Sequence, residues 1–236
     1  MHQQALVISQ EIGDRQGEGC ALGRLGAAYE RLGSYERAID FHQQHLNIAR
    51  EIGDRWDEGI ALGNLGAAYN RLGNYEQAIN FYQQALIISR DTGNRWGEGA
   101  ALGSLGVVYD YLGSYEQAIS LHQQALIISR EIGNRWSEGA ALGNLGATQL
   151  KESQHSEALE NTQAALQIFQ EIGGREGEAE ALKNLAEIYQ LLGNVDVARV
   201  NAQQALTLAT ELGIPLKIEC EVLLQKIESS GGSCRN

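Results

Sequence analysis

Proline is nearly absent from this sequence: it occurs once, as Pro215, in a chain of 236 residues. Because proline is the residue that most strongly interrupts a helix, helices can run without a break before that point. Cysteine is also scarce, with three residues at spacings that fit neither a metal site nor a disulfide framework. An odd and sparse cysteine count is typical of a reducing compartment, so we expect a cytoplasmic protein.

Long apolar runs and a surplus of basic residues are missing as well. No apolar stretch approaches the roughly 20 residues that a membrane-spanning helix needs, and residues 1–12 lack the apolar segment and basic flank of a signal peptide. Acidic residues outnumber basic ones by 30 to 18, which gives a net charge of −12. Phosphate backbones repel such a chain, so we expect no nucleic-acid partner and no membrane partner.

The sequence is rich in repetition. The stretch 61–86 returns almost letter for letter 40 residues earlier and 40 residues later. A fixed period of about 20 to 50 residues indicates stacked repeats that form one elongated array. The same spacing aligns one column of leucines and one of alanines: Leu22, Leu62, Leu102, Leu142 and Leu182, and Ala38, Ala78, Ala118, Ala158 and Ala198.

We expect residues 1–229 to form a single array and residues 230–236 to form a disordered tail. Residues 1–12 match the second helix of a partial repeat, and residues 213–229 are expected to form a C-terminal capping helix. The apolar stripe of that helix is Leu216, Cys220, Leu223 and Ile227. The full repeats are 13–52, 53–92, 93–132, 133–172 and 173–212.

Each repeat is predicted to contain two helices. A glycine such as Gly73 or Gly53 can end one helix in a left-handed conformation, and the residue after it, Asn74 or Asp54, can cap the next. Ser114 is expected to open a capping box at the equivalent turn of the next repeat. The core-facing stripe of the first helix in repeat 53–92 is Leu62, Leu65, Tyr69 and Leu72.

No catalytic or metal-binding set stands apart from the repeat columns. Gly66 recurs in mid-helix beside the core stripe, so we interpret it as a packing glycine and not as part of a phosphate loop. His42 and His45 have no third ligand nearby in the sequence, which favours packing over metal binding. Residues that recur in every repeat serve the repeat, so we expect neither enzyme activity nor a cofactor.

The repeat resembles a known family. The order Leu62, Leu65-Gly66, Tyr69, Ala78, Tyr82 and Ala85 resembles the tetratricopeptide repeat. The 40-residue repeat length resembles the LGN/Pins-like polarity adaptors and the arrays attached to bacterial signalling proteins. The resemblance implies an all-α fold, an α-solenoid of stacked antiparallel helix pairs in a right-handed superhelix. It also implies that the first helices line a concave groove, which usually binds a peptide or helix of a partner protein.

The side of each first helix that points away from its core stripe, which we call the groove face, is rich in small and uncharged residues. Asn64, Asn144 and Asn184 match the adaptor pattern, whereas Ala67 and Val107 stand where chaperone-binding arrays often place asparagine, so a carboxylate clamp is not supported. The alternative is that facing helices of a tightly wound array touch across this face. The candidate groove residues are Arg24, Arg31, Asn64, Ala67, Asn70, Arg71, Ser104, Val107, Tyr111, Asn144 and Asn184.

Two residue types suggest how a ligand would bind. Arg24, Arg31 and Arg71 cluster in the first two repeats, which favours a ligand with acidic residues there; alternatively, these arginines are solvated and balance local acids. A column of tryptophans follows the long turns, and it forms either a ledge along the groove or a cover for the end of the preceding second helix. These candidate groove-edge residues are Trp56, Trp96 and Trp136.

The leading hypothesis is therefore a protein–protein interaction scaffold that binds a peptide or helical segment, with acidic character as a further expectation. The alternative is a regulatory or sensor array of a larger signalling protein. Because the helix at 2–12 lacks its partner, either the chain is a piece of a longer protein or this end self-associates. The degenerate segment 146–162, in which Ser153 and His155 replace glycine and tyrosine, is predicted to be the weakest part of the array.

Overall fold

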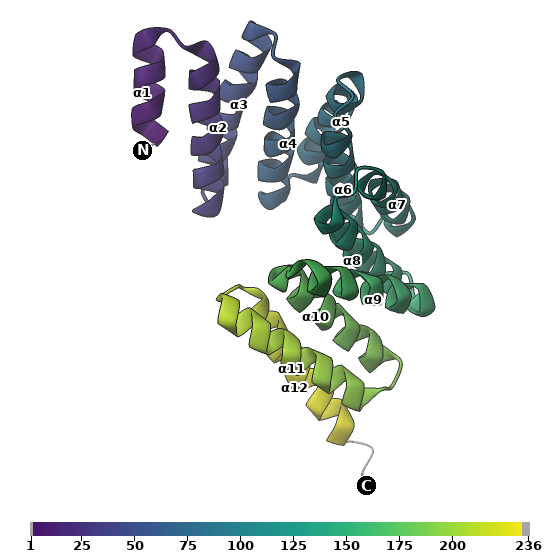
Figure 1. The fold of residues 1–236 in the computed structure, drawn as a ribbon. Helices are drawn as coiled ribbons and strands as arrows, with labels where there is room; N and C mark the ends of the chain where they lie inside the picture. The colour runs from purple at the N-terminus through teal and green to yellow at the C-terminus, as the bar shows by residue number, and fades with distance from the viewer. Residues whose placement is uncertain (1, 233–236) are drawn as a thin grey trace. The chain divides into compact units, whose positions relative to one another are not determined.

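The computed structural model describes residues 2–232 and places them in twelve α-helices, with no strand among the described residues (Figure 1). The chain is an all-α solenoid built from helix pairs joined by short turns. The helices are α1 His2–Ile12, α2 Arg15–Arg31, α3 Tyr35–Ile52, α4 Arg55–Arg71, α5 Tyr75–Asp91, α6 Arg95–Tyr111, α7 Tyr115–Glu131, α8 Arg135–Lys151, α9 His155–Ile172, α10 Arg175–Leu191, α11 Val195–Leu212 and α12 Leu216–Gly232.

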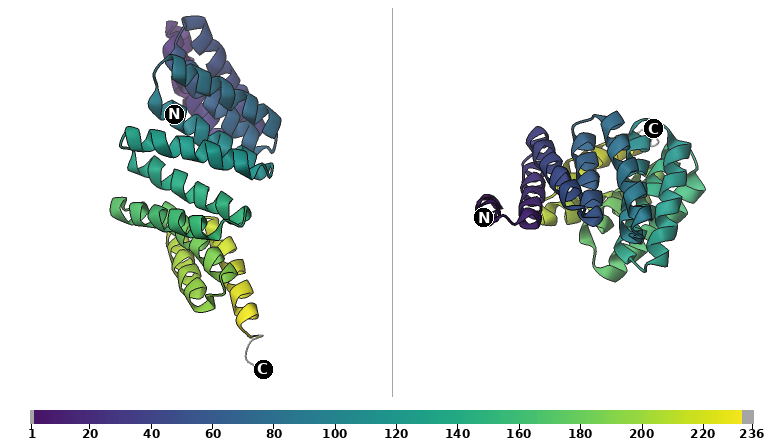
Figure 2. Two further views of the ribbon diagram at one scale, coloured as in Figure 1. Left: turned by 90° about the vertical axis from the view of Figure 1, so that its right-hand side faces the viewer. Right: turned by 90° about the horizontal axis from the view of Figure 1, so that it is seen from above.

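The helices form two compact bodies. The N-terminal body ends at Gly113 and contains α1 to α6; the C-terminal body begins at Ser114 and contains α7 to α12. Within each body every helix packs against the next one along the chain, as the neighbouring ribbons of Figure 2 show. First helices of neighbouring repeats also touch, as α2 and α4 do. This alternation is the stacking that the 40-residue period predicts.

The turns confirm most of the predicted caps. Gly53 and Gly73 adopt the left-handed conformation, and the side chains of Asp54 and Asn74 accept hydrogen bonds from backbone N–H groups of the helix that follows. The prediction for Ser114 is wrong, because its side chain makes no capping hydrogen bond. The backbone at that turn is closed instead by the bond from Ala118 N to Ser114 O.

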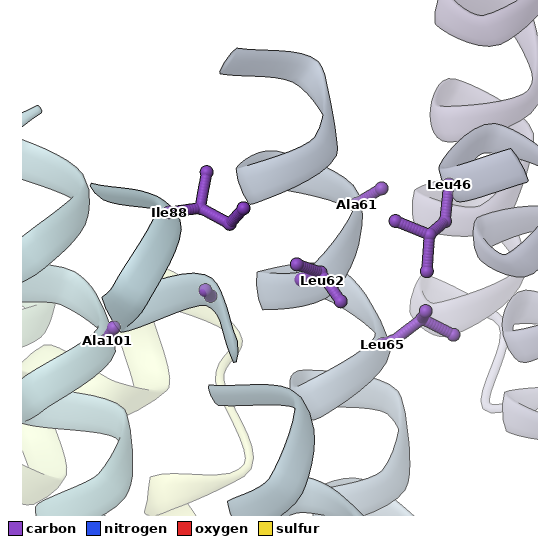
Figure 3. Close-up of a cluster of buried hydrophobic side chains, with 7 residues drawn as sticks. Leu46, Ala61, Leu62, Leu65, Ile88 and Ala101 are labelled. Carbon is purple, nitrogen blue, oxygen red and sulfur yellow. The ribbon is translucent and has the colours of Figure 1, made fainter. Parts of the chain in front are cut away.

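The core of the N-terminal body lies between the helices of successive repeats. Figure 3 shows leucine, isoleucine and alanine side chains that meet there from α3, α4, α5 and α6. Leu72 was expected in this stripe but is 42% exposed, because it follows the last helical residue of α4. The cluster consists of Leu46, Ala61, Leu62, Leu65, Ala85, Ile88 and Ala101.

Gly66 has the packing role that the sequence suggests. A Cβ atom added to Gly66 would lie 2.6 Å from the ring of Tyr82 on α5, closer than real Cβ contacts. The missing side chain lets α4 and α5 approach, and this gain outweighs the roughly 1 kcal/mol that glycine costs inside a helix.

Helix α12 covers the end of the C-terminal body. Cys220, Leu223 and Ile227 are buried in clusters with residues of α10 and α11, and Leu216 packs against them, as the predicted stripe requires. The helix extends to Gly232, so residues 230–232 are helical and not part of a tail. Residues 233–236, the rest of the predicted tail, lie outside the described residues.

A repeated ion-pair cluster links three helices at a time, and we call it the glutamate clamp. Glu58, on α4, receives hydrogen bonds from Arg50 of α3 at 2.9 Å and from Arg55 of its own helix at 2.6 Å. Arg55 also reaches Asp91 at the end of α5, 3.4 Å away. The sequence suggests only the local Arg55–Glu58 pair. The same contacts recur around Glu98 and Glu138, so each such junction between repeats is fastened by the same chemistry.

The glutamates of the clamp are held in the charged form. Each is at least 90% buried, and burial alone opposes the charge. The two arginine hydrogen bonds outweigh that effect, so the pKa of Glu58, of Glu98 and of Glu138 lies below the ordinary value.

Candidate functional site

The groove face of the N-terminal body contains a pocket between the first helices α4 and α6, which we call the α4–α6 pocket. Its volume is about 280 Å³, and most of its lining is apolar. Two predicted groove residues of α4 and one of α6 line it together with the predicted edge residue Trp96, and α5 supplies the floor. The lining residues are Gly59, Ile60, Gly63, Asn64, Ala67, Tyr82, Ala85, Ser89, Asn94, Trp96, Gly97, Ala100, Ala101 and Ser104.

The floor of this pocket is neutral. Burial raises the pKa of Tyr82 to about 12, although a hydrogen bond with Ser104 opposes the shift. Tyr82 therefore stays protonated at any ordinary pH, and its hydroxyl group is bonded to a groove-face residue. The pocket offers apolar surface with few polar groups at its rim, which suits an apolar side chain better than an ion.

The arginines of the groove face differ from the others in the described part of the chain. Arg24, Arg31 and Arg71 are exposed, and none of them has a carboxylate within ion-pair distance. Among residues 2–232 every other arginine is in an ion pair, except Arg37, which lies over the ring of Tyr29. Both interpretations of these three arginines, ligand binding and the balance of local acidic charge, therefore stay predictions.

Two buried histidines lie behind the groove face of α2. His42 Nε2 is 3.3 Å from Glu30 Oε1, and His45 Nε2 is 3.5 Å from Asp57 Oδ2. Both rings are at least 95% buried, and neither nitrogen of either ring has a hydrogen-bond partner within the usual distance and angle. Burial lowers the pKa of His45, against the opposing charge of Asp57. No group of three or more potential metal ligands occurs among residues 2–232.

The tryptophan column is about half exposed, with Trp96 at 57%. Trp96 lines the α4–α6 pocket, as a ledge would. Trp136 stands edge-on to the ring of Phe169 on α9, with centroids 5.3 Å apart. Helix α9 follows Trp136 in the chain, whereas the predicted cover concerns the preceding second helix, so both interpretations of the column stay predictions. Trp56 is exposed, and it lines neither the α4–α6 pocket nor a second pocket that lies between α8 and α10.

The C-terminal body has an equivalent pocket of about 240 Å³ between α8 and α10. It brings together the predicted residues Asn144, Asn184 and Trp136, but its rim also carries Glu176 and Glu180. Burial raises the pKa of Glu180, and the nearby Glu176 adds to the shift. This pocket is thus acidic where the arginine-bearing groove face of the N-terminal body is basic.

The remaining predicted groove residues do not line these two pockets. Asn70, on α4, has a buried Oδ1 atom without a hydrogen-bond partner. Tyr111, at the end of α6, stacks on Tyr75 of α5 with ring centroids 5.8 Å apart, which is a packing contact. Val107 is half-buried on the groove face of α6.

A further hollow of about 470 Å³ between α8, α10 and α12 was not predicted. Its apolar rim comes from Leu191, Ile218 and Val222, all of which are at least 60% exposed. The sequence contains a signal for this hollow. Glu219 and Lys226 of α12 stand at the repeat positions that Gly59 and Gly66 occupy in α4, where the second helix packs closely. Helix α12 therefore turns a different face to its neighbours than the other first helices do, which is its packing phase. The hollow's polar side holds Lys183, which pairs with Glu187 and Glu219.

Comparisons with known proteins agree with this architecture. The profile described as tetratricopeptide repeat matches residues 1–51, 57–131 and 137–211. No curated protein matches the sequence. None of the helices in the described range is long and apolar enough to cross a membrane.

Three solved structures illustrate the likeness in fold. BtubC from P. vanneervenii has a TM-score of 0.77 at 18% identity, over 90% of this chain and 89% of that one. The signal transduction ATPase PH0952 from Pyrococcus horikoshii, which has a tetratricopeptide repeat sensor, has a TM-score of 0.73 at 21% sequence identity. The match covers 91% of this chain and 34% of that one. NprR in complex with its cognate peptide NprX has a TM-score of 0.68 at 16% sequence identity. The match covers 95% of this chain and 64% of that one.

Proposed function

Because the chain belongs to the tetratricopeptide repeat family, we propose that it is a non-catalytic interaction scaffold whose groove face binds a peptide or helical segment of a partner protein. The repeats support an interaction or sensor array, and the likeness to NprR, solved with its peptide, agrees with a peptide partner. Such a scaffold needs no cofactor, because binding alone is its function.

The observation that carries this proposal is the set of unpaired arginines. Arg24, Arg31 and Arg71 remain without carboxylate partners in a chain of net charge −12. An exposed guanidinium group can form a bidentate pair with a carboxylate, in which two N–H groups each donate a hydrogen bond to one oxygen. The partner segment that we propose is therefore acidic where it meets α2 and α4.

Selection from a displayed library of random twelve-residue peptides tests the proposal. We expect the full chain to enrich peptides that contain Asp and Glu. The variant with Arg24, Arg31 and Arg71 all changed to alanine should lose that enrichment. The control variant changes Arg199 and Lys217 to alanine, which removes two exposed cations from α11 and α12 and should select like the wild type. Unchanged selection by the triple variant would contradict the proposal.

A second role is that of a regulatory or sensor array within a larger signalling protein. The observation that favours it is the likeness to the sensor-bearing ATPase, of which this chain spans 34%. The two roles share the same groove face and differ in what the bound segment controls. Sequencing the gene on both sides of this segment distinguishes them, because the regulatory role requires a catalytic or switch domain encoded in frame.

Self-association through α1 is a further part of the proposal. Ile8 is 55% exposed, whereas its equivalents Ile48, Ile88, Ile128 and Ile168 are all buried. Val7 and Ile12 of the same helix are exposed as well. Sedimentation velocity at rising concentration should show a dimer that the change Ile8→Glu abolishes. A wild type that stays monomeric at about 100 μM, a hundredfold above the ~1 μM dissociation constant of a moderate dimer, would contradict self-association.

A further inference from the structure

We propose that the bound segment carries one apolar side chain, which occupies the α4–α6 pocket, and one acidic residue two to four positions away, which pairs with Arg71 and Arg31. This inference rests on the proposed function and narrows it to a class of peptide. Its elements are the pocket, the free polar groups beside it and the distance between the pocket and the arginines.

The pocket is suited to a single side chain. Its volume of about 280 Å³ is at the small end of the roughly 300 to 1,000 Å³ that ligand pockets occupy. A Cβ atom added to Gly63 would meet nothing within 4 Å, so the space above this glycine is open to an occupant. Ile60 and Trp96 supply exposed apolar surface at the rim. Tryptophan is among the residues that most often dominate binding energy at interfaces.

Polar groups beside the pocket fit a peptide backbone. Asn64 lines the pocket, and its side-chain amide makes no hydrogen bond with another described residue. An extended segment has backbone N–H and C=O groups along both edges. These groups can pair with the amide of Asn64 while the apolar side chain enters the pocket.

The spacing follows from helix geometry. Arg71 lies four residues beyond Ala67 and eight beyond Gly63, two residues that line the pocket, which corresponds to about 6 to 12 Å along α4. An extended peptide advances about 3.3 Å per residue, so two to four residues separate the two contacts. Arg31 stands at the equivalent position of the adjacent first helix α2, so the acidic residue meets two guanidinium groups at the same end of the groove face.

The probes are fluorescein-labelled twelve-residue peptides of glycine and serine that carry one leucine and one aspartate. Fluorescence anisotropy with the full chain measures their affinity as the separation between leucine and aspartate is varied from one to eight residues. We expect the tightest binding at two to four residues, and a loss of at least tenfold at one and at eight. Replacing the leucine by serine should cause a similar loss.

Protein variants locate the pocket. Gly63→Leu fills the open space with a residue that favours the helix, so the chain should fold and lose at least tenfold in affinity. Gly143→Leu, at the same position in the C-terminal body, is the matched control and should bind like the wild type. Trp96→Ala is a second pocket variant, expected to weaken binding without moving the preferred separation.

Each other outcome overturns the inference. Wild-type affinity in Gly63→Leu, or no dependence on separation, removes the pocket as the anchor. If the serine peptide binds as tightly as the leucine peptide and the triple arginine variant still loses binding, the proposed function stands and this inference fails. Absence of binding by every peptide in the set also overturns it.

Discussion

Ser153 is the one described residue other than glycine with a positive φ, at 62°. It occupies the turn position that Gly113 fills in the preceding repeat, where φ is 74°. A residue with a Cβ atom in this conformation costs roughly 1 to 2 kcal/mol. The turn of repeat 133–172 is therefore strained by a single side chain.

Ser153→Gly should stabilise the protein by about 1 kcal/mol, because the glycine adopts the same conformation without steric cost. Urea unfolding followed by circular dichroism measures the change in unfolding free energy. The matched control is Gly113→Ser, which should lower stability by a similar amount. If Ser153→Gly does not raise the free energy of unfolding and Gly113→Ser does not lower it, or if Ser153→Gly lowers it, the turn carries no strain.

His45 makes stability depend on pH. Its folded-state pKa lies below the ordinary value because of burial, so the unfolded chain binds the proton more readily. Stability is then complete above the unfolded pKa of about 6.5 and falls as the pH drops below it. The titratable neighbours of the ring are Asp57 and Asp54, and His42 on the same helix.

His45→Ala should flatten the fall in stability between about pH 6.5 and pH 5, since it removes the group that takes up the proton. Alanine already occupies this column as Ala85, Ala125, Ala165 and Ala205, so the helix pair accommodates it. Thermal unfolding across this pH range provides the measurement. An equally steep fall in the variant would assign the pH dependence to other groups.

At the scale of helices, the glutamate clamp holds repeats together. Glu58→Gln keeps the side-chain shape but removes the charge that two arginines share, and it should cost about 1 to 3 kcal/mol. Because the folded-state pKa of Glu58 is below the ordinary value, the clamp contributes stability above the unfolded pKa of about 4.3 and loses it as the pH falls through the folded pKa.

Urea unfolding at pH 7 and at pH 3 checks this prediction: the difference between wild type and Glu58→Gln should shrink at the lower pH. The exposed pair Arg199–Asp196 offers the comparison, since Asp196→Asn should change stability by less than about 1 kcal/mol. If Glu58→Gln lowers the free energy of unfolding equally at both pH values, the stabilising effect of Glu58 comes from its shape and not from its charge.

The helix pair α8–α9 remains the predicted weak element. Thr162 has a buried hydroxyl without a hydrogen-bond partner, and Ser153 is strained. The bond from Asn161 Nδ2 to Gln149 Oε1 at 2.8 Å offsets part of this cost. Amide hydrogen exchange should be faster across residues 146–162 than across residues 66–82, where Tyr82 fills the same position. Equal exchange rates in the two segments would refute the idea.

The sequence predicts helix positions well because every turn between the described helices contains a left-handed glycine or, at Ser153, its substitute. It predicts less about side chains at helix ends: Leu72 is exposed and Ser114 does not cap, since a helical wheel does not account for where the helix stops. The pairing state of Arg24, Arg31 and Arg71 could not be read from the sequence either. It depends on which carboxylates lie within 4 Å, and those come from other helices.

At the scale of the whole chain, one repeat should be removable. Deleting residues 53–92 joins Ile52 to Gly93 and places Arg50 opposite Glu98, which has the same contacts as Glu58. Since array stability is roughly a sum of repeat and junction terms, we expect a shorter protein that unfolds cooperatively at a somewhat lower temperature. Circular dichroism should show unchanged helicity per residue; a partly unfolded product would contradict it.

The glutamate clamp has a consequence for how such a gene can change. Duplication or loss of a whole 40-residue segment within residues 13–132 leaves a matched Arg–Glu–Arg junction, because Arg50, Arg90 and Arg130 share one column. The number of copies can therefore change there while the fold persists. Arg24 has no arginine at the equivalent position of another repeat, and α12 alone has its packing phase, so the two ends keep their individual character whatever the copy number between them.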